Sequence, residues 1–444
     1  MGIISFPAPQ VVVDSNGAMK NYTNGTFDSL FISKDTKNYD EALKMYFTIL
    51  NIINEVFEED DYVPALYRLE IGNVYAMIAR TYLGMGNIDE CLNYLEQMVD
   101  LEIYHNKVKV KEFKIKNKYL DKYTFIDLFA GLGGFHIALE SLGAKCVYAN
   151  EWDSHAQEVY KANFNILPEG DITKVDEKAI PDHDILCAGF PCQAFSISGK
   201  RLGFQDSRGT LFFDVARIVK EKRPKVVFME NVKNFASHDG GKTIAVVKAT
   251  MEELGYTFDY KVLNAVDYGI PQKRERVYMV CFRNDIDNTS FRFPKPFRLT
   301  RYVKDFLLED EDMVKHLYIN REDTYYKNIK DNKYSDKSIR LGIVNKGGQG
   351  ERIYSTKGIA ITFSAYGGGV FAKTGGYLVN GKPRRLHPRE CARLMGYPDS
   401  YILSPKATQA YKQFGNSVVI DVLQLIAQEI GKTLEGVKNE GALF

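Results

Sequence analysis

The alternation of short β-rich runs with helical stretches after Tyr123 constrains the fold of this chain more than any other feature. Five apolar runs of strand length follow one another: TFIDLF, KCVYAN, HDILCAGF, KVVFMEN and VYMVCF. Stretches with helical spacing separate them. This alternation is typical of βαβ units, because a parallel connection needs a crossover of helix length. The pattern therefore predicts an α/β fold, a parallel sheet with helices on both faces.

The regions outside this alternation differ from it in composition and in the spacing of their apolar residues. Residues 38–106 carry apolar side chains at helical spacing and resemble one or two imperfect tetratricopeptide-type hairpins, for which a small helical appendage is the plainer interpretation. The stretch KVKVKEFKIKNK is basic and alternating, and a solvated tether is its default interpretation. The predicted segments are a loop or disordered tail at 1–37, a helical appendage at 38–106, a basic linker at 107–122, an α/β domain at 123–300, an irregular loop-rich domain at 301–385 and a C-terminal part at 386–444 that returns to the α/β domain.

Charge is distributed unevenly along the 444 residues. Residues 1–106 hold 6 Lys and Arg against 16 Asp and Glu, whereas residues 107–444 hold 52 against 41. The larger part would attract a polyanion, which points weakly to nucleic acid, since modest positive charge is also common on other soluble enzymes. No run of about 18 apolar residues suggests a membrane span. The N-terminus lacks the features of a secretory signal, and the six cysteines lack disulfide spacing. These features predict a cytoplasmic, reducing environment.

A glycine-rich turn follows the first predicted strand, in FIDLFAGLGGFHIALESLG. Glycines 131, 133 and 134 would let backbone N–H groups approach a ligand closely. Glu151 ends the next strand and is placed to hold ribose hydroxyls of a nucleoside cofactor. The spacing misses a full dinucleotide fingerprint, and a P-loop motif is absent. Trp152 is either a core aromatic or a platform for adenine, and Asp171 either accepts from the adenine amino group or is a surface N-cap.

Cys192 follows another predicted strand in the Pro/Gly-rich loop HDILCAGFPCQAFSISG. Ligand chemistry in open α/β sheets sits at this edge, and a thiol of lowered pKa is a nucleophile. Cys187, inside the strand, is expected to be a packing residue, and the lone C-x4-C spacing makes zinc improbable. Glu230 could serve as acid or hydrogen-bond donor beside the nucleophile. Arg274 and Arg276 face the same way on an extended segment, where a strand-edge ion pair is the plainer interpretation.

In chain order, the motifs DLFAGLGG, NEWD, GDIT, GFPCQAFS, ENV, QKRERVY, RRLHPRECARLMGYP and QFGNSV resemble the ordered motif set of the DNA cytosine-5 methyltransferases. The resemblance covers about 123–444 and extends to DSRGTLFFD, KGGQGERIYST and SAYGGG outside the catalytic motifs. It implies an S-adenosylmethionine-dependent methyltransferase fold. Its Rossmann-like sheet would form the catalytic domain at 123–300, and 301–385 would be the smaller target recognition domain. The α-helical N-terminal segment has no counterpart in this resemblance, so its role stays open.

The resemblance also implies the chemistry. Cys192 would attack C6 of a cytosine flipped out of the duplex, Glu230 would bond or protonate N3, and Arg276, with Arg274, would steady the site. The loop 196–209 would close over the flipped base. No metal is implied. The residues implied to bind S-adenosylmethionine are Phe129, Gly131, Gly133, Gly134, Glu151, Trp152, Asp171, Ile172, Leu211 and Asn416; those implied to contact DNA are Ser196, Ile197, Ser198, Gln349, Arg352 and Thr362.

The resemblance further implies double-stranded GCGC as the target, with the first cytosine methylated, and a monomer that protects DNA from a restriction endonuclease of the same specificity. Two alternatives stay open at this point. One is an RNA cytosine-5 methyltransferase of the tRNA type, which also carries a Pro-Cys loop. The other is a catalytically idle DNA-binding or adaptor protein directed by the N-terminal segment. The groove-contacting residues of 301–385 favour DNA over RNA, and the intact Cys192 and Glu230 argue against an idle protein.

Overall fold

The computed structural model describes residues 118–191, 211–327 and 333–437, together with the backbone of three short strands nearer the N-terminus. The chain divides into two compact units, Met1–Lys111 and Glu112–Phe444. The predicted helical appendage and most of the predicted linker lie outside the described residues.

The first unit contains a small antiparallel sheet of β1 (Gly2–Ile4), β2 (Gln10–Val13) and β3 (Met19–Tyr22) in that order. The sequence analysis expected loop or tail over this stretch. The β-branched run Val11–Val13 lies in the central strand, where β-branched side chains are favoured.

The second unit is built on a six-stranded sheet in the order β5-β4-β6-β7-β9-β8. Its first four strands in this order are parallel, whereas β9 runs antiparallel to both of its neighbours. The prediction of a wholly parallel sheet was therefore wrong for β9. The strands are β4 (Thr124–Leu128), β5 (Lys145–Asn150), β6 (Ile185–Ala188), β7 (Val226–Val232), β8 (Asp259–Asn264) and β9 (Glu275–Phe282).

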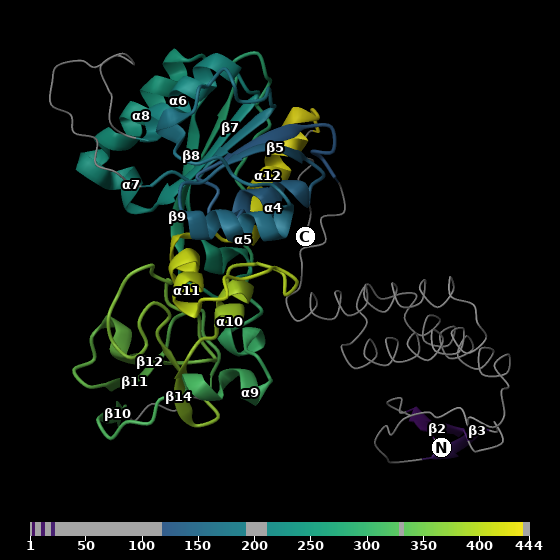
Figure 1. Cartoon of the computed structure of the whole chain (residues 1–444), viewed down its shortest axis with the longest axis vertical. Coiled ribbons are helices and arrows are strands. Elements are labelled where there is room, and N and C mark those ends of the chain that lie inside the picture. The colour runs from purple at the N-terminus through teal and green to yellow at the C-terminus, as the bar shows by residue number, and fades with distance from the viewer. Residues whose placement is uncertain are drawn as a thin grey trace. The chain divides into compact units, whose positions relative to one another are not determined.

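Helices cover both faces of this sheet (Figure 1). On one face, α6 places Phe212, Val215 and Val219 at helical spacing in the main apolar core, together with residues of α7 and α8. On the other face, α4 packs against α12, so the C-terminal segment lies beside the first βα unit. These helices are α4 (Gly134–Glu140), α5 (Ser154–Phe164), α6 (Leu211–Lys222), α7 (Asn234–Ser237), α8 (Lys242–Glu253) and α12 (Ile420–Leu434).

A second sheet of five short strands occupies the region expected to be irregular. Neighbouring strands are antiparallel except β12 and β13, which are parallel. None of these strands exceeds five residues. The sequence therefore contains no long apolar run from which the sheet could be predicted. The strands are β10 (Thr324–Tyr326), β11 (Arg340–Val344), β12 (Arg352–Ser355), β13 (Gly376–Val379) and β14 (Lys382–Arg385).

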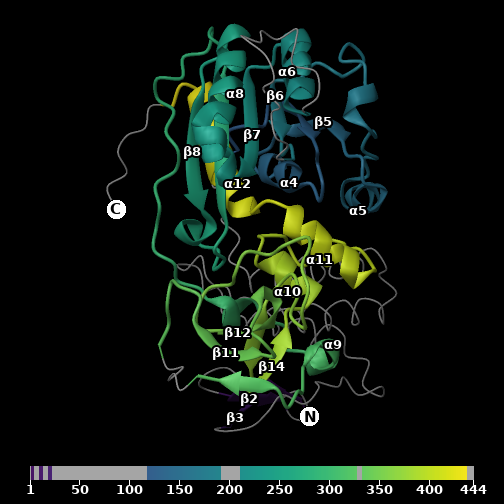
Figure 2. The ribbon, with the colours of Figure 1, turned by 90° about the vertical axis from the view of Figure 1, so that its left-hand side faces the viewer.

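Two helices, α10 (Pro388–Arg393) and α11 (Ala407–Asn416), lie between the two sheets, as Figure 2 shows. The short α9 (Glu311–Val314) precedes the five-stranded sheet in the chain. The part of the chain that the structure describes contains no helix with the length and apolar character to cross a membrane.

Candidate active site

The carboxyl ends of β4, β5, β6 and β7 meet at one edge of the large sheet, because these strands run parallel. The glycine turn follows β4, Glu151 follows β5, Gly189 follows β6, and Glu230 lies near the end of β7. Ligands of open α/β sheets bind at this edge. Among the described residues, the topology thus places the glycine turn, Glu151, Gly189 and Glu230 at the same edge of the sheet.

The glycine turn has an unusual backbone. Phe129, Gly131 and Gly133 have φ angles of +56°, +54° and +71°, a region that strongly favours glycine. A Cβ on Gly133 would overlap the ring of Phe164, and one on Gly134 would overlap the side chain of Val418. The turn is therefore packed too closely for larger residues, and its conformation is fixed by α5 and the segment before α12.

Glu151 holds the turn from the next strand. Its Oε2 accepts a hydrogen bond from the Gly131 N–H at 2.8 Å, and its Oε1 accepts one from the Asp153 N–H at 2.8 Å. Burial raises the pKa of Glu151, and these N–H groups oppose the rise. Each carboxylate oxygen keeps a second lone pair that a ligand hydroxyl can use. Beside it Trp152 is 81% exposed, so it is not a core residue.

The segment that carries Asp171 runs along the end of β5. The Glu151 N–H donates to the Glu169 carbonyl at 2.8 Å, and the Glu169 N–H donates to the Ala149 carbonyl at 2.9 Å. Asp171 is an N-cap, since its Oδ1 accepts from the Thr173 N–H at 3.1 Å and the Thr173 hydroxyl at 2.8 Å. Asp171 is therefore a helix N-cap, as one of the two interpretations expected. Its other oxygen, Oδ2, lies 3.5 Å from the Lys174 ammonium.

Arg217 of α6 anchors the same segment and was missed by the sequence analysis. Its Nη2 donates to the Ile172 carbonyl at 2.6 Å and its Nη1 donates to the Val175 carbonyl at 2.9 Å, while its Nε pairs with Asp214 at 3.0 Å. The available signal was a single arginine within the apolar helix LFFDVARIVK. Ile172 itself is buried, and Leu211 begins α6.

Glu230 is buried at the end of β7 and forms an ion pair with Arg276 of β9, with 3.0 Å between Oε1 and Nε. Burial raises the pKa of this carboxyl, and Arg276 and Arg274 oppose the rise. A Cβ on Gly189 would stand 3.9 Å from Glu230 Oε2. The site therefore contains a carboxyl group that is shielded from solvent and holds its proton to a higher pH than usual.

Asn231, the residue after Glu230, was also missed by the sequence analysis. It holds the segment that follows β6 next to β7. Its Nδ2 donates to the Phe190 carbonyl at 2.9 Å. The signal was a polar pair inside the buried run VVFMEN. Phe190 leads through Pro191 into Cys192, which lies outside the described residues, as do Ser196, Ile197 and Ser198.

Arg274 and Asn416 occupy a different part of the site. Arg274 is buried and donates to backbone carbonyls of two distant segments, Phe363 and the turn around Asn416. Asn416 ends α11, and its side chain is exposed. Nearby, Lys412 of α11 pairs with Asp153 at 3.0 Å, which joins α11 to the edge that carries Glu151.

Two glycine-rich loops of the second sheet lie against each other. A Cβ on Gly350 would overlap the Gly368 carbonyl, and the Phe371 N–H donates to the Gly350 carbonyl at 2.8 Å. Gln349 lies on the first loop with its side chain exposed, and Arg352 begins β12 with its Nε 3.3 Å from the Gly347 carbonyl. On the second loop, the Thr362 hydroxyl donates to the Lys273 carbonyl. The loops thus bring the three predicted DNA-contacting residues of this region onto one supported framework.

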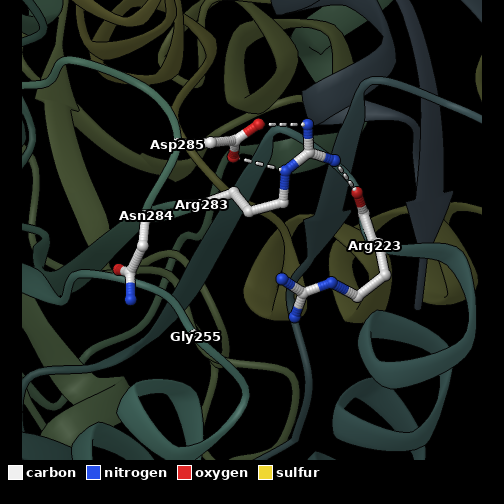
Figure 3. A pocket seen from close by; sticks show the side chains of 5 residues that line it. All are labelled: Arg223, Gly255, Arg283, Asn284 and Asp285. Atoms are coloured by element: carbon white, nitrogen blue, oxygen red, sulfur yellow. Dashed lines mark hydrogen bonds and ion pairs between the residues drawn. The ribbon is translucent and has the colours of Figure 1, made fainter.

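A polar pocket lies at the opposite end of the large sheet, where β7 begins and β9 ends (Figure 3). Arg283 forks onto Asp285, with Nε–Oδ1 and Nη2–Oδ2 distances of 2.6 and 2.9 Å. Gly255, Arg223 and Asn284 complete its lining. Four residues of extended strand, about 13 Å, separate the start of β7 from Glu230. This pocket is therefore separate from the carboxyl edge.

The family model of the C-5 cytosine-specific DNA methylases matches residues 123–432. The chain belongs to this family. The Type II methyltransferase M.HhaI of Haemophilus parahaemolyticus is 71% identical over 321 residues, which cover 72% of this chain and 98% of that protein. M.HpaII of Haemophilus parainfluenzae is 42% identical over 329 residues, 70% of this chain and 89% of that protein.

Solved structures agree on the fold. The Dnmt2 methyltransferase of S. pombe superposes with a TM-score of 0.52 at 18% identity, covering 71% of this chain and 99% of that one. A DNMT2 mutant of Spodoptera frugiperda gives 0.52 at 20% identity, covering 70% and 99%. The predicted methyltransferase α/β fold is confirmed. By family, the chain is a DNA cytosine-5 methyltransferase whose methyl donor is S-adenosylmethionine.

Proposed function

We propose that this enzyme methylates the first cytosine of GCGC in double-stranded DNA, with Cys192 as nucleophile and Glu230 as proton donor. The observation that carries the chemistry is the shielded Glu230 carboxyl, paired with Arg276 at 3.0 Å and flanked by the chain that leads into Cys192. A carboxyl whose pKa is raised by burial is a better match for proton transfer to a ring nitrogen than a carboxyl in water.

The chain's own groups divide the work as follows. The target cytosine leaves the duplex, since its C6 cannot be reached in the stack. The Cys192 thiolate forms a bond to C6, and Glu230 delivers a proton to N3, which neutralises the ring as electron density moves toward C5. Arg276 holds the Glu230 carboxyl toward the base. When the cofactor is bound, its sulfonium supplies the methyl group to C5. The C5 proton is then lost to water, the electrons of the broken C5–H bond form the C5–C6 double bond as the Cys192 thiolate leaves C6, and N3 returns its proton to Glu230, which restores the aromatic ring.

The carboxyl edge fits the methyl donor. We propose that Glu151 accepts from the ribose hydroxyls with its remaining lone pairs and that the exposed Trp152 stacks on the adenine. We propose that Asp171 accepts from the adenine amino group with Oδ2, the oxygen that lies 3.5 Å from Lys174. The remaining proposed contacts are Phe129, Gly131, Gly133, Gly134, Ile172, Leu211 and Asn416.

The GCGC target is proposed from the 71% identity to M.HhaI and from the loops that carry Gln349 and Arg352. Arginine forms a bidentate pair with guanine O6 and N7. Gln349, with Ser198, would fill the space left by the flipped cytosine, and Thr362, with Ser196 and Ile197, would contact the adjoining DNA. We further propose that the enzyme acts as a monomer in the cytoplasm beside a restriction endonuclease of the same specificity.

The test is label transfer from S-[methyl-³H]adenosylmethionine by the purified full chain. The substrates are a duplex with one GCGC site, a duplex in which that site is permuted, the GCGC duplex already methylated at both first cytosines, and tRNA. The proposal expects label on the unmodified GCGC duplex alone. Equal labelling of the permuted or premethylated duplex would remove the proposed target, and labelling of tRNA alone would remove DNA as the substrate.

A further inference from the structure

We propose that Arg274 is a positioning residue that couples DNA recognition to cofactor binding, rather than a group that touches the reacting base. This inference rests on the proposed function and deepens it. The sequence analysis grouped Arg274 with Arg276 because the two side chains share one side of an extended segment. The structure gives them different partners: Arg276 pairs with Glu230, and Arg274 binds backbone carbonyls.

The guanidinium of Arg274 joins two segments that are far apart in sequence. Its Nη1 donates to the Phe363 carbonyl at 3.3 Å, and its Nη2 donates to the Gly415 carbonyl at 3.0 Å and to the Ser417 carbonyl. The residue is 1% exposed. A planar guanidinium can hold carbonyls in several directions at once, which a lysine ammonium on a flexible stem does less well.

The first of these segments is the recognition loop, and its backbone is also bonded to the Arg274 strand. The Ala360 N–H donates to the Pro271 carbonyl at 2.7 Å, and the Lys273 N–H donates to the Ala360 carbonyl at 2.9 Å. The Thr362 hydroxyl donates to the Lys273 carbonyl. Residues 271–274 therefore lie along 360–363, and a shift of the loop on DNA moves the strand that enters the catalytic site.

The second segment is the turn around Asn416, the residue proposed to contact the cofactor. The two carbonyls that Arg274 holds belong to Gly415 and Ser417, its neighbours on either side. A Cβ on Gly415 would overlap the backbone at Ala365, so the turn also touches the recognition loop directly. The Ser417 hydroxyl is within 2.6 Å of the Tyr397 hydroxyl, which fixes its other side.

These contacts make one connected network with two ligand sites at its ends. DNA would act on 360–363, the cofactor would act on Asn416, and Arg274 bonds to both segments. Two residues further along the same strand, Arg276 holds Glu230. Coupling of this kind is a free energy shared by two sites, so each ligand must change the affinity of the other by the same factor.

The experiment compares the full-length wild type with Arg274→Lys and with Arg283→Lys as the matched control. Arg283 follows the other end of the same β9 strand and also bonds a backbone carbonyl, that of Arg223, in the pocket of Figure 3. The affinity for S-adenosylhomocysteine is measured by calorimetry with and without the GCGC duplex. Methyl transfer to that duplex and the melting temperature are measured in parallel.

We expect the duplex to tighten S-adenosylhomocysteine binding to the wild type by about fivefold or more, the usual range for coupled sites. Arg274→Lys should abolish this factor and lower kcat by roughly tenfold to a hundredfold, as misplaced catalytic groups do. Arg283→Lys should keep both. Gly415→Ala provides an independent test, since it separates the same two segments while leaving Arg274 in place, and it too should lose the coupling.

The proposal would be overturned if Arg274→Lys kept both the wild-type kcat and the wild-type effect of the duplex on S-adenosylhomocysteine affinity. It would also be overturned if Arg283→Lys lost both to the same extent as Arg274→Lys. If Arg274→Lys fails to fold, Gly415→Ala decides by the same criterion. Methylation by the wild type is measured on the same duplex. An inactive wild type therefore counts against the proposed function, whereas an active wild type without coupling counts against the role of Arg274.

Discussion

The carboxyl edge of the six-stranded sheet and the glycine-rich loops of the five-stranded sheet hold their polar side chains in opposite ways. At the edge, Glu151 and Glu230 are buried, and their oxygens are held by backbone N–H groups or by Arg276. On the loops, the backbone is fixed by contacts such as that of Gly350 with Gly368, while Gln349 stays exposed.

The difference separates two requirements of the enzyme. Chemistry needs groups whose position and protonation are set before the base arrives, and burial with fixed partners supplies both. Recognition needs donors and acceptors that remain free to meet base edges, and a rigid backbone can present them without using them. Substitutions at the edge should therefore change rate, whereas substitutions on the loops should change the choice of site.

The largest effect is expected at the nucleophile. Cys192→Ser should abolish methyl transfer, because a serine hydroxyl has no thiolate-like form near neutral pH. Binding of S-adenosylmethionine, followed by calorimetry, should persist, since the proposed cofactor contacts lie on other strands. Loss of cofactor binding together with activity would assign Cys192 a structural role.

A smaller loss is expected at the proton donor. Glu230→Gln keeps the shape of the side chain but removes its proton, so kcat should fall by about 10²–10⁴. Preference for GCGC over a permuted site should stay unchanged, because Glu230 acts on the base whichever sequence surrounds it. A changed preference with an unchanged kcat would place Glu230 among the recognition groups and break the comparison.

At Arg352, beside the glycine-rich loop, we expect the site preference to change and kcat to stay nearly constant. Arg352→Ala should weaken discrimination at one guanine by ~1–3 kcal/mol while leaving turnover on saturating cognate DNA near the wild-type value. The ratio of kcat/KM on cognate and single-substituted sites measures it. An unchanged ratio would remove Arg352 from base recognition and leave it as support for its own loop, through Gly347.

The smallest effect on activity and site preference is expected at the buried Asp127, whose contribution is to stability. Burial, together with the Glu151 charge, raises the pKa of Asp127 well above its ordinary value. The folded state then keeps a proton that the unfolded state releases above pH ~4, so the free energy of unfolding falls as the pH rises from there. Asp127→Asn should reduce this fall, by about 1.4 kcal/mol for each unit of pKa difference, in urea midpoints between about pH 4 and 8. Asp182→Asn, whose side chain is 95% exposed, should show the wild-type slope.

The sequence predicted the edge better than the loops, for a physical reason. Four parallel strands were visible as apolar runs, and their carboxyl ends share an edge whichever helices connect them, so Glu151 and Glu230 could be placed at the same edge of the sheet. The antiparallel direction of β9 was not visible in the sequence. The existence of β8 was not visible either, because DYKVLN is an edge strand whose first three side chains are exposed. The five-stranded sheet was missed since its strands are short.

Contacts to backbone carbonyls were the least predictable part of the site. Arg274 meets Phe363 and Gly415, 89 and 141 residues further along the chain, and a carbonyl carries no trace of its partner in the sequence. Arg217 and Asn231 were missed for the same reason. Side-chain pairs such as Glu230 with Arg276 were open to prediction because both partners have a recognisable charge.

The most direct test of the account uses a GCGC duplex with 5-fluorocytosine at the first cytosine, incubated with the full chain and S-adenosylmethionine. Fluorine at C5 cannot leave as a proton, so the nucleophile should remain attached to C6. The account predicts a covalent protein–DNA adduct that peptide mapping assigns to Cys192, and no adduct with Cys192→Ser. An adduct at another residue, or methyl transfer without any adduct, would contradict it.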